Sequence, residues 1–414
     1  MNDPIFNVAP AVSRHAKHGD DLLCFSHLRW NFVYQRPQHL MTRFARDRRV
    51  FFVEEPIDDA TEPRLNVTTD AGVTVVVPHL PPQLGAVLST RLQQILLGNL
   101  LRDHQIVHPI LWYCTPMALE WSRGVQAKAI VFDCMDELSA FAHAPASLLA
   151  REQELLQRAD LVFTGGHSLY EAKKHKHPRV HAFPSSVDAE HFGRARAPQS
   201  EPSDQASIPR PRVGFFGVID ERMDLELVAG VARSRPDWHQ VLIGPVVKID
   251  SASLPRAHNI HYLGMKGYGD LPAYLAGWDV AYLPFARNDA TRFISPTKTP
   301  EYLAAGRPVV STSIADVVRP YGERGLVTIA DTPEEMASAL DNALAVSDES
   351  WLRRVDDHVS NLSWDRTYAA MNRLVNEAAG TTSEPRGSRE QIMTTLQLGD
   401  SDVRLLDRRG GLRG

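Results

Sequence analysis

The segment SPTKTPEYLAAGRPVVS, residues 295–311, has residue types that suit an anion-binding helix start. It follows an apolar run at 280–283 that is typical of a buried strand. Ser295 or Thr297 can serve as the N-cap, and Gly306 with a nearby proline ends the helix before the next strand. The first N–H groups of such a helix lack internal acceptors, and with the helix dipole they attract a phosphate. A capped surface helix would show the same pattern.

Two charged side chains in this segment add to its suitability. Lys298 would bring a full positive charge to a phosphate at the helix start. Glu301, one turn further, can accept hydrogen bonds from ribose hydroxyls. The alternative is a solvated lysine on an ordinary surface helix, so the caps and charges alone do not establish a site.

A second set of polar residues follows the strands expected in the N-terminal half, where open α/β sheets bind ligands. Asp133, Asp136 and Glu137 are the strongest candidates for acid–base chemistry or for binding sugar hydroxyls, since clustered carboxylates are costly unless they bind something. They could equally be the N-cap and first-turn acids of the next helix. His167 follows two glycines and precedes a helix, so it is either a catalytic candidate or an anchor of the turn.

Further candidates lie around the loop after the first strand. His27 is one, because the neighbouring Arg29 and Trp30 make this loop unusually rich in charged and aromatic side chains for a simple connection. Arg36 lies at a helix start and could meet an acceptor phosphate, although such an arginine is more often a surface residue. The basic run at 173–177 lies at an expected helix C-terminus, where cations complement the dipole, and a membrane-surface role is the less favoured interpretation.

These residues need two sheets to position them. Short β-branched and aromatic runs alternate with helix-length amphipathic stretches, which predicts two doubly wound, Rossmann-like α/β domains facing a cleft. The expected strands are 22–26, 50–53, 73–77, 110–113, 129–133, 161–164 and 180–183, and then 213–216, 240–243, 260–263, 280–283, 309–311 and 326–329. The predicted divisions are an N-terminal domain at 20–193, a linker at 194–212, a C-terminal domain at 213–350, helices at 351–378 and a mobile tail at 379–414.

The composition is that of an ordinary folded protein of two domains. The chain has 414 residues, of which 43% are hydrophobic and 23% charged, and a formal net charge of −5, which gives no global reason to bind nucleic acid. Three cysteines at long spacings argue against a disulfide framework or a structural zinc site. Residues 1–21 contain no apolar signal-peptide core, and no stretch approaches a spanning helix, so we expect a cytoplasmic protein.

The order of motifs resembles the GT-B glycosyltransferases, especially family 4, of the group 1 type. The run from Glu301, EYLAAGRPVV, is similar to the donor-site motif of that family, and VGFFGVID from Val213 is similar to its opening strand and glycine loop. The opening HLRWNFVYQRPQHL from His27 is similar to a branch that includes teichuronic-acid biosynthesis glycosyltransferases. The resemblance assigns the donor ribose to Glu301 and the diphosphate to backbone near Thr297 and Lys298. It also implies that a C-terminal helix returns toward the first domain.

The resemblance implies transfer of a hexose, with retention, from a nucleotide diphosphate-sugar to a glycan or lipid-linked acceptor in bacterial-type polysaccharide or envelope synthesis. We expect no cofactor and no metal, because D-x-D occurs only at Asp400–Asp402. Weak association with the inner face of a membrane is a further expectation. The chain departs from the family at Phe293, where a sugar-side glutamate is usual, and at Val218, where an arginine is usual, and Arg222 is the nearest basic substitute.

Of three other functions, two remain open at this point and one is disfavoured. A non-catalytic nucleotide-sugar-binding or scaffold protein would keep the cleft without turnover, and the departures at Phe293 and Val218 favour it. A nucleotide-sugar epimerase shares the architecture. A dinucleotide oxidoreductase is disfavoured, because no G-x-G-x-x-G follows an early strand.

Overall fold

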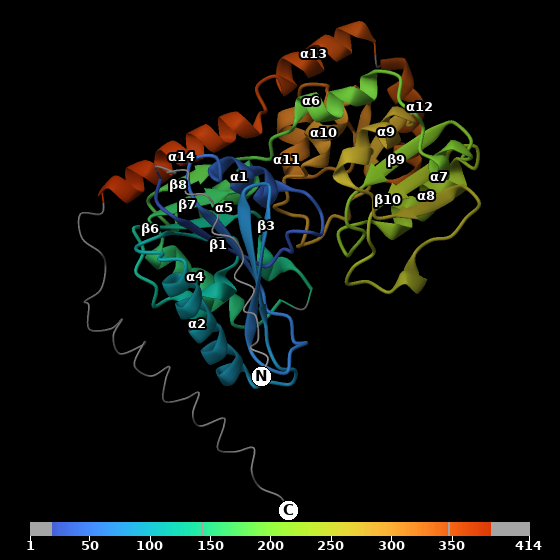
Figure 1. Cartoon of the computed structure of the whole chain (residues 1–414). Coiled ribbons are helices and arrows are strands. Elements are labelled where there is room, and N and C mark those ends of the chain that lie inside the picture. Colours follow the sequence, from blue (N-terminus) through green and yellow to red (C-terminus); the bar gives the residue numbers. More distant parts are fainter. Residues whose placement is uncertain (1–18, 143, 347, 382–414) are drawn as a thin grey trace, which may run out of the picture.

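The computed structural model describes residues 19–142, 144–346 and 348–381, and these form two α/β domains that lie side by side (Figure 1). Each domain is built around one sheet with helices against it. The predicted fold class, two α/β domains with largely parallel sheets, is confirmed. The expected mobile tail falls mostly on residues 382–414, which lie outside the described part of the chain.

The N-terminal sheet has eight strands in the order β3-β4-β2-β1-β5-β6-β7-β8. All neighbours pair in parallel except β3 and β4, which are antiparallel. The edge strand β3 was not predicted, because its residues are mostly exposed and polar and give no apolar pattern. The strands are β1 Leu22–Ser26, β2 Val50–Glu54, β3 Arg64–Asp70, β4 Val73–His79, β5 Ile110–Tyr113, β6 Ala129–Cys134, β7 Leu161–Thr164 and β8 Val180–Ala182.

The C-terminal sheet has six strands, all parallel, in the order β11-β10-β9-β12-β13-β14. Its central strands are entirely buried, as expected for a parallel sheet covered on both faces. The strands are β9 Arg212–Phe216, β10 His239–Ile243, β11 Ile260–Gly264, β12 Val280–Leu283, β13 Val309–Ser311 and β14 Thr328–Ile329.

Helices connect and cover the strands in both domains. They are α1 Arg36–Phe44, α2 Ala86–Asp103, α3 Leu119–Ser122, α4 Leu148–Arg158, α5 His167–Lys173, α6 Ala189–Gly193, α7 Ser203–Ala206, α8 Leu225–Ser234, α9 Leu271–Ala276, α10 Lys298–Ala304, α11 Ala315–Val317, α12 Pro333–Val346, α13 Glu349–Val359 and α14 Trp364–Thr381. Within the described ranges, no helix combines the length and the apolar character needed to cross a bilayer.

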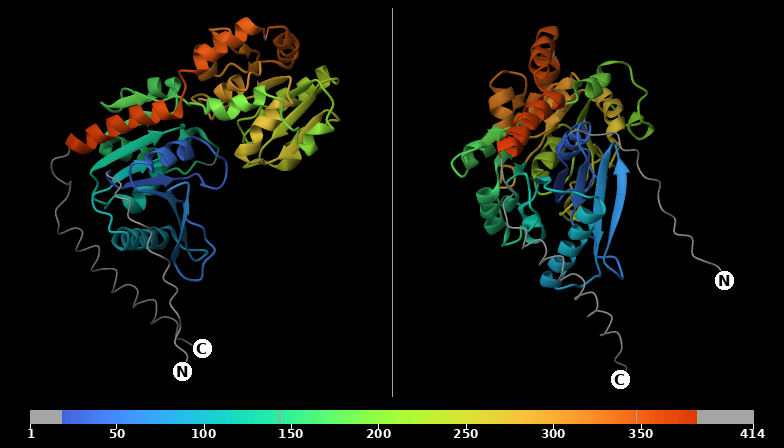
Figure 2. Two further views of the ribbon diagram at one scale, coloured as in Figure 1. Left: turned by 45° about the horizontal axis from the view of Figure 1, so that its top comes forward. Right: turned by 60° about the vertical axis from the view of Figure 1, so that its left-hand side comes forward.

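The last helix crosses back to the N-terminal domain, which confirms that expectation. Figure 2 shows α14 lying along that domain, away from the sheet of the C-terminal domain. Trp364, Met371 and Val375 of α14 join the hydrophobic cluster on one face of the N-terminal sheet. The Trp364 ring also stacks on His39 of α1 at a centroid distance of 4.6 Å. The two domains are therefore tied by two chain crossings, at residues 194–212 and at the start of α14.

The segment 194–212 is more structured than a free linker. It contains a short 3-10 helix, Arg194–Arg196, and α7, and then enters β9 at Arg212. Ala195, Gln205 and Ile208 are buried, and Gln205 accepts a hydrogen bond from the Trp278 indole N–H at 2.9 Å. A few apolar residues and the buried Gln205 thus hold this segment against the C-terminal domain, although most of its residues are polar.

Candidate functional site

A cleft lies between the two domains at the carboxyl ends of both sheets, where open α/β folds bind ligands. The N-terminal wall is formed by Leu28, Val33, Gln35, Arg36, Met135, Asp136, Gly165 and Ser185. The C-terminal wall is formed by Phe215, Val218, Arg222, Phe285, Ile294, Ser295, Pro296, Thr297 and Lys298. The domains also touch beside it, because the Ser185 hydroxyl donates to the Ser295 carbonyl at 2.9 Å.

The predicted anion site faces this cleft. Helix α10 begins at Lys298, with Thr297 at the N-cap position, and both residues line the cleft. Of the two predicted N-cap residues, Thr297 holds the position and Ser295 does not, although the Thr297 side chain makes no capping hydrogen bond. Thr297 already has α-helical dihedral angles, whereas a capping side chain usually belongs to a residue with extended ones. The Thr297 hydroxyl is therefore not used in a cap.

Lys298 reaches the cleft across the glycine loop after β9. Gly217 has a φ of +148°, a conformation that favours glycine, and a Cβ at this position would overlap the Lys298 side chain. Gly244 follows β10 with a φ of +144°, and a Cβ there would overlap the Gly217 carbonyl oxygen. The two glycines thus allow the close approach that places the ammonium group at the cleft.

The charged groups around Lys298 are unevenly paired. The Arg222 guanidinium contacts Asp220 at 2.7 Å, and Asp220 is buried. Among the described residues, neither the Lys298 ammonium nor the Asp136 carboxylate has an ion-pair partner within contact distance. Burial lowers the pKa of Lys298. Burial also raises the pKa of Asp136, and the positive charge of Arg222 opposes that rise. One cation and one carboxylate therefore remain available to a ligand in the cleft.

Glu301 lies one turn deeper than Lys298. It is only 7% exposed, and burial raises its pKa to about 7, against the opposing effect of Lys298. Burial and then the charge of Glu301 raise the pKa of Tyr268, whose buried hydroxyl has no hydrogen-bond partner among the described residues. The Glu301 carboxylate thus lies behind the residues that line the cleft, close to a second buried polar group.

Asp133 is occupied by another predicted site residue. The Arg36 guanidinium donates to both Asp133 oxygens, at 2.7 and 3.2 Å, and to the Phe183 carbonyl at 2.7 Å. Both side chains are buried, with exposures of 5% and 1%. The expectations that Arg36 binds an acceptor phosphate and that Asp133 is a catalytic acid or base do not fit this pairing, because each group satisfies the other. The carboxylate that faces the cleft is Asp136.

The two predicted histidines occupy different environments. His167 is the first residue of α5 and is exposed, and it is not among the residues that line the cleft. His27 follows β1, and its Nδ1 atom is buried without a partner among the described residues. Burial, and then the positive charge of Lys248 in the C-terminal domain, lower the pKa of His27 to about 4. His27 is therefore neutral at pH 7 and lies near the opposite domain.

Phe293, which stands where the family glutamate is usual, belongs to a domain contact. Its ring packs against the hydrophobic cluster of the N-terminal domain that includes Phe25 and Leu169, and it does not line the cleft. The Arg292 guanidinium lies 5.1 Å from the ring centroid. The residue thus contributes to packing between domains instead of contacting a sugar.

Sequence reasoning missed Asp316. Its Oδ1 atom accepts from the Ser168 backbone N–H at 2.9 Å, across the domain boundary, and a Cβ on Gly166 would overlap its Oδ2 atom. Gly166, the glycine directly before His167, therefore makes room for a carboxylate from the other domain. No local motif marks Asp316, and only the two glycines before a helix hinted at a close approach.

Comparison with known proteins agrees with this geometry. Residues 210–345 match the family model described as "Glycosyl transferases group 1". The chain is 25% identical over 234 residues to the Bacillus subtilis (strain 168) protein named "Putative teichuronic acid biosynthesis glycosyltransferase TuaH". That match covers 51% of this chain and 58% of the relative, so the chain spans little more than half of the relative's length.

Two solved structures share the whole architecture. Sucrose-phosphate synthase from Thermosynechococcus elongatus has a TM-score of 0.67 at 14% identity, covering 87% of this chain and 99% of its own. The structure described as "Trehalose-6-phosphate from E. coli bound with UDP-2-fluoro glucose" has a TM-score of 0.64 at 14% identity, covering 89% of this chain and 100% of its own. At these identities the likeness establishes the common fold. Residues 210–345 therefore resemble the group 1 glycosyltransferases, and the chain shares the two-domain α/β fold of these solved structures.

Proposed function

We propose that this protein transfers a hexose, with retention, from a nucleotide diphosphate-sugar to an acceptor hydroxyl in the synthesis of a bacterial-type envelope polysaccharide. The observation that carries the proposal is the Lys298 ammonium, which faces the interdomain cleft without an ion-pair partner among the described residues. A diphosphate is the complementary ligand. The names of the relative and of the UDP-2-fluoro glucose structure support a nucleotide-sugar donor and an envelope polysaccharide.

The arrangement suggests how the chain would assist the transfer. Lys298 would stabilise the charge that develops on the leaving diphosphate, which is often the largest catalytic contribution in such reactions. Arg222, which is held in an ion pair by Asp220 on the same wall, would take a secondary part. Asp136, on the opposite wall, is the candidate to contact the transferred sugar or to accept a proton from the acceptor. Glu301 would bind the ribose, as the resemblance implies. The remaining contribution is positioning, since both substrates must meet in one cleft.

The reaction is proposed to need no metal or other cofactor, because fixed cations at the cleft can supply the positive charge that a metal ion would otherwise provide. Transfer measured in excess EDTA tests this directly, with added Mg²⁺ or Mn²⁺ as the comparison. Rates that agree within about twofold are expected. A rate that depends on the added metal would overturn this part of the proposal.

The test of the main proposal begins with binding. Thermal unfolding is measured with UDP, GDP, ADP, CDP and dTDP and with their common sugar conjugates. We expect at least one nucleotide diphosphate to raise the unfolding temperature, because a ligand that binds only the native state stabilises it. The conjugate of that nucleotide is then assayed for transfer or slow hydrolysis, and the anomeric configuration of the product is read by NMR. No stabilisation by any nucleotide would refute the proposal.

One observation favours a second candidate, a nucleotide-sugar-binding protein without turnover. Phe293 packs between the domains where the family has a glutamate, so a usual sugar contact is missing. This alternative predicts nucleotide-sugar binding of normal strength with neither transfer nor hydrolysis. A nucleotide-sugar epimerase would instead release an isomerised donor, which the same NMR spectrum identifies.

We propose a cytoplasmic location, with a glycan or lipid-linked acceptor and at most weak contact with the inner face of a membrane. The basic run at 173–177 supports only a weak contact, because the Lys173 side chain is buried and paired with Glu137 at 2.7 Å and with Glu152 at 2.5 Å. Co-sedimentation with anionic lipid vesicles checks this proposal. Tight binding to the vesicles would contradict it.

A further inference from the structure

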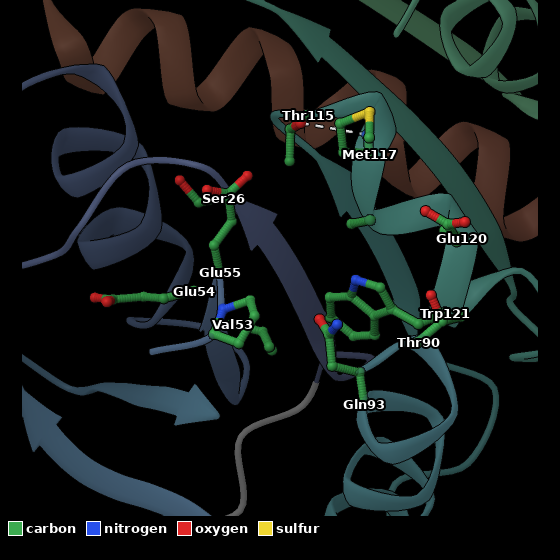
Figure 3. A pocket seen from close by; sticks show the side chains of 12 residues that line it. Ser26, Val53, Glu54, Glu55, Thr90, Gln93, Thr115, Met117, Glu120 and Trp121 are labelled. Atoms are coloured by element: carbon green, nitrogen blue, oxygen red, sulfur yellow. Dashed lines mark hydrogen bonds between the residues drawn. The ribbon is translucent and has the colours of Figure 1, made fainter. Parts of the chain in front are cut away.

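A second pocket lies in the N-terminal domain, at the carboxyl ends of β1, β2 and β5. Its volume is ≈ 270 Å³. It is lined by Ser26, Val53, Glu54, Glu55, Pro56, Thr90, Gln93, Thr115, Met117, Ala118, Glu120 and Trp121 (Figure 3). Small-molecule sites usually have volumes of roughly 300–1,000 Å³, so this pocket suits about one sugar ring.

The pocket adjoins the cleft that holds Lys298. Ser26 lines the pocket and Leu28 lines the cleft, so the loop after β1 separates the two, with His27 between them. Lys248 of the C-terminal domain acts electrostatically on both His27 and Glu55, which places this second domain opposite the pocket. A molecule held in the pocket would therefore lie beside the proposed donor site.

One wall of the pocket carries a buried polar group that lacks a partner. Gln93 is 8% exposed, and its amide nitrogen donates to the Ser89 hydroxyl at 3.2 Å. Its Oε1 atom is buried and has no hydrogen bond among the described residues. Figure 3 shows this amide directed from α2 into the pocket, beside the Trp121 ring. An unsatisfied buried acceptor is costly, and a ligand hydroxyl or amino group would satisfy it.

The charges of the pocket are one-sided. Three of its lining residues are glutamates and none is basic. Glu54 is neutralised by Arg29 at 3.0 Å and accepts from the Trp30 backbone N–H at 2.8 Å, so it supports the wall and is not free to bind. Glu120 is 3.2 Å from Arg151. The Glu55 carboxylate has no ion-pair or hydrogen-bond partner within the part of the chain that the structure describes.

We propose that this pocket binds the acceptor, and that it selects a hexose end that is uncharged or carries an amino group while rejecting one that carries a phosphate. That the bound sugar is the acceptor rests on the proposed function, whereas the preference of the pocket for one sugar over another does not. The Gln93 carbonyl and the Glu55 carboxylate accept hydrogen bonds from hydroxyl or ammonium groups, and Trp121 offers an apolar surface to a sugar ring. A phosphate monoester carries a charge of about −1.5 to −2, which the carboxylates of Glu55 and Glu120 would repel.

The test measures sugar binding with the cleft already filled. The full chain is saturated with the nucleotide diphosphate that stabilises it most, and tryptophan fluorescence is followed during titration with glucose, glucosamine and their 6-phosphates. The 6-phosphates should bind at least fivefold more weakly than the parent sugars. Trp121→Phe should remove most of the sugar-dependent signal, which assigns the signal to this pocket.

Variants separate recognition from folding. Gln93→Met keeps the side-chain length and should weaken glucose and glucosamine binding at least fivefold, whereas Gln153→Met, at an exposed position of α4, should not change it. Glu55→Lys should strengthen binding of the 6-phosphates at least fivefold and weaken glucosamine. Binding of the nucleotide diphosphate should be unchanged in these variants, which shows that they are folded.

The outcomes distinguish this inference from the proposed function. If a nucleotide diphosphate binds but no sugar does, or the 6-phosphates bind as well as the parent sugars, or Gln93→Met has no effect, the inference is overturned. If no nucleotide diphosphate binds, the titrations are carried out on the free protein. The donor proposal then falls, and the sugar preference stands or falls on its own titrations.

Discussion

Arg36 and Asp133 form a buried two-point ion pair across the N-terminal domain, with an Nη2 to Oδ1 distance of 2.7 Å and an Nε to Oδ2 distance of 3.2 Å. Arg36 begins α1 and Asp133 lies near the end of β6, 97 residues away. The pair fixes the start of α1 against the end of β6. It therefore helps to define the cleft wall on which Asp136 lies.

Breaking this pair should destabilise the protein strongly. Asp133→Ala leaves the Arg36 guanidinium buried without its counter-charge, which typically costs about 3–5 kcal/mol. Urea unfolding followed by circular dichroism measures the change. Arg353→Ala removes an exposed pair with Glu349 and is the control, because exposed pairs contribute little. Equal effects of the two substitutions would contradict the role assigned to Asp133.

Removing the cation at the cleft should weaken donor binding. Lys298→Gln should lower the affinity for the stabilising nucleotide diphosphate by about tenfold, or ~1.4 kcal/mol, since a charge-assisted contact with phosphate is lost. Isothermal titration calorimetry provides the dissociation constant. Arg256→Gln, an exposed position of the same domain, is the matched control. Unchanged affinity in Lys298→Gln would place the diphosphate elsewhere.

Glu301 should make the stability of the free protein depend on pH. Its pKa is raised by burial from 4.5 to about 7, so the native state holds this proton more tightly than the unfolded chain does. Stability from this group is therefore fully present below pH 4.5 and is lost as the pH rises toward 7, by an amount on the order of 3 kcal/mol.

The matching variant is Glu301→Gln, which stays neutral throughout. Its free energy of unfolding should fall less than that of the native sequence between pH 5 and pH 7.5, and the difference between the two proteins should vanish near pH 4. Urea titrations at several pH values give these energies. Parallel pH profiles for the two proteins would show that the Glu301 carboxyl is not perturbed.

Introducing a glutamate at position 293, where the family that the chain resembles usually has one, should harm this protein. Phe293→Glu would place a charge against the apolar cluster that includes Phe25 and Leu169, at a cost in desolvation. The unfolding temperature should fall by several degrees, while Phe293→Leu should cost much less. Affinity for the nucleotide diphosphate should not increase, because the side chain does not line the cleft. A tighter-binding, equally stable Phe293→Glu variant would contradict this placement.

Much of the architecture followed from local patterns in the sequence. The apolar runs predicted as strands, such as 22–26 and 280–283, coincide with β1 and β12, because a strand buried on both faces needs consecutive apolar residues. The edge strand β3 was missed because an exposed strand needs no such run. The segment 194–212 looked like a free linker because the apolar residues that hold it are few.

The sequence by itself determined where Lys298, Glu301 and Asp136 fall, at the starts of helices and the ends of strands, because those positions depend on neighbouring residues. Only the tertiary structure decided which of the charged groups are free to bind a ligand. Asp133 is taken by Arg36, Asp316 binds α5 from the opposite domain at a separation of 148 residues, and Phe293 packs between domains. Such pairings depend on strand order and domain packing, which bring together residues that no local sequence pattern links.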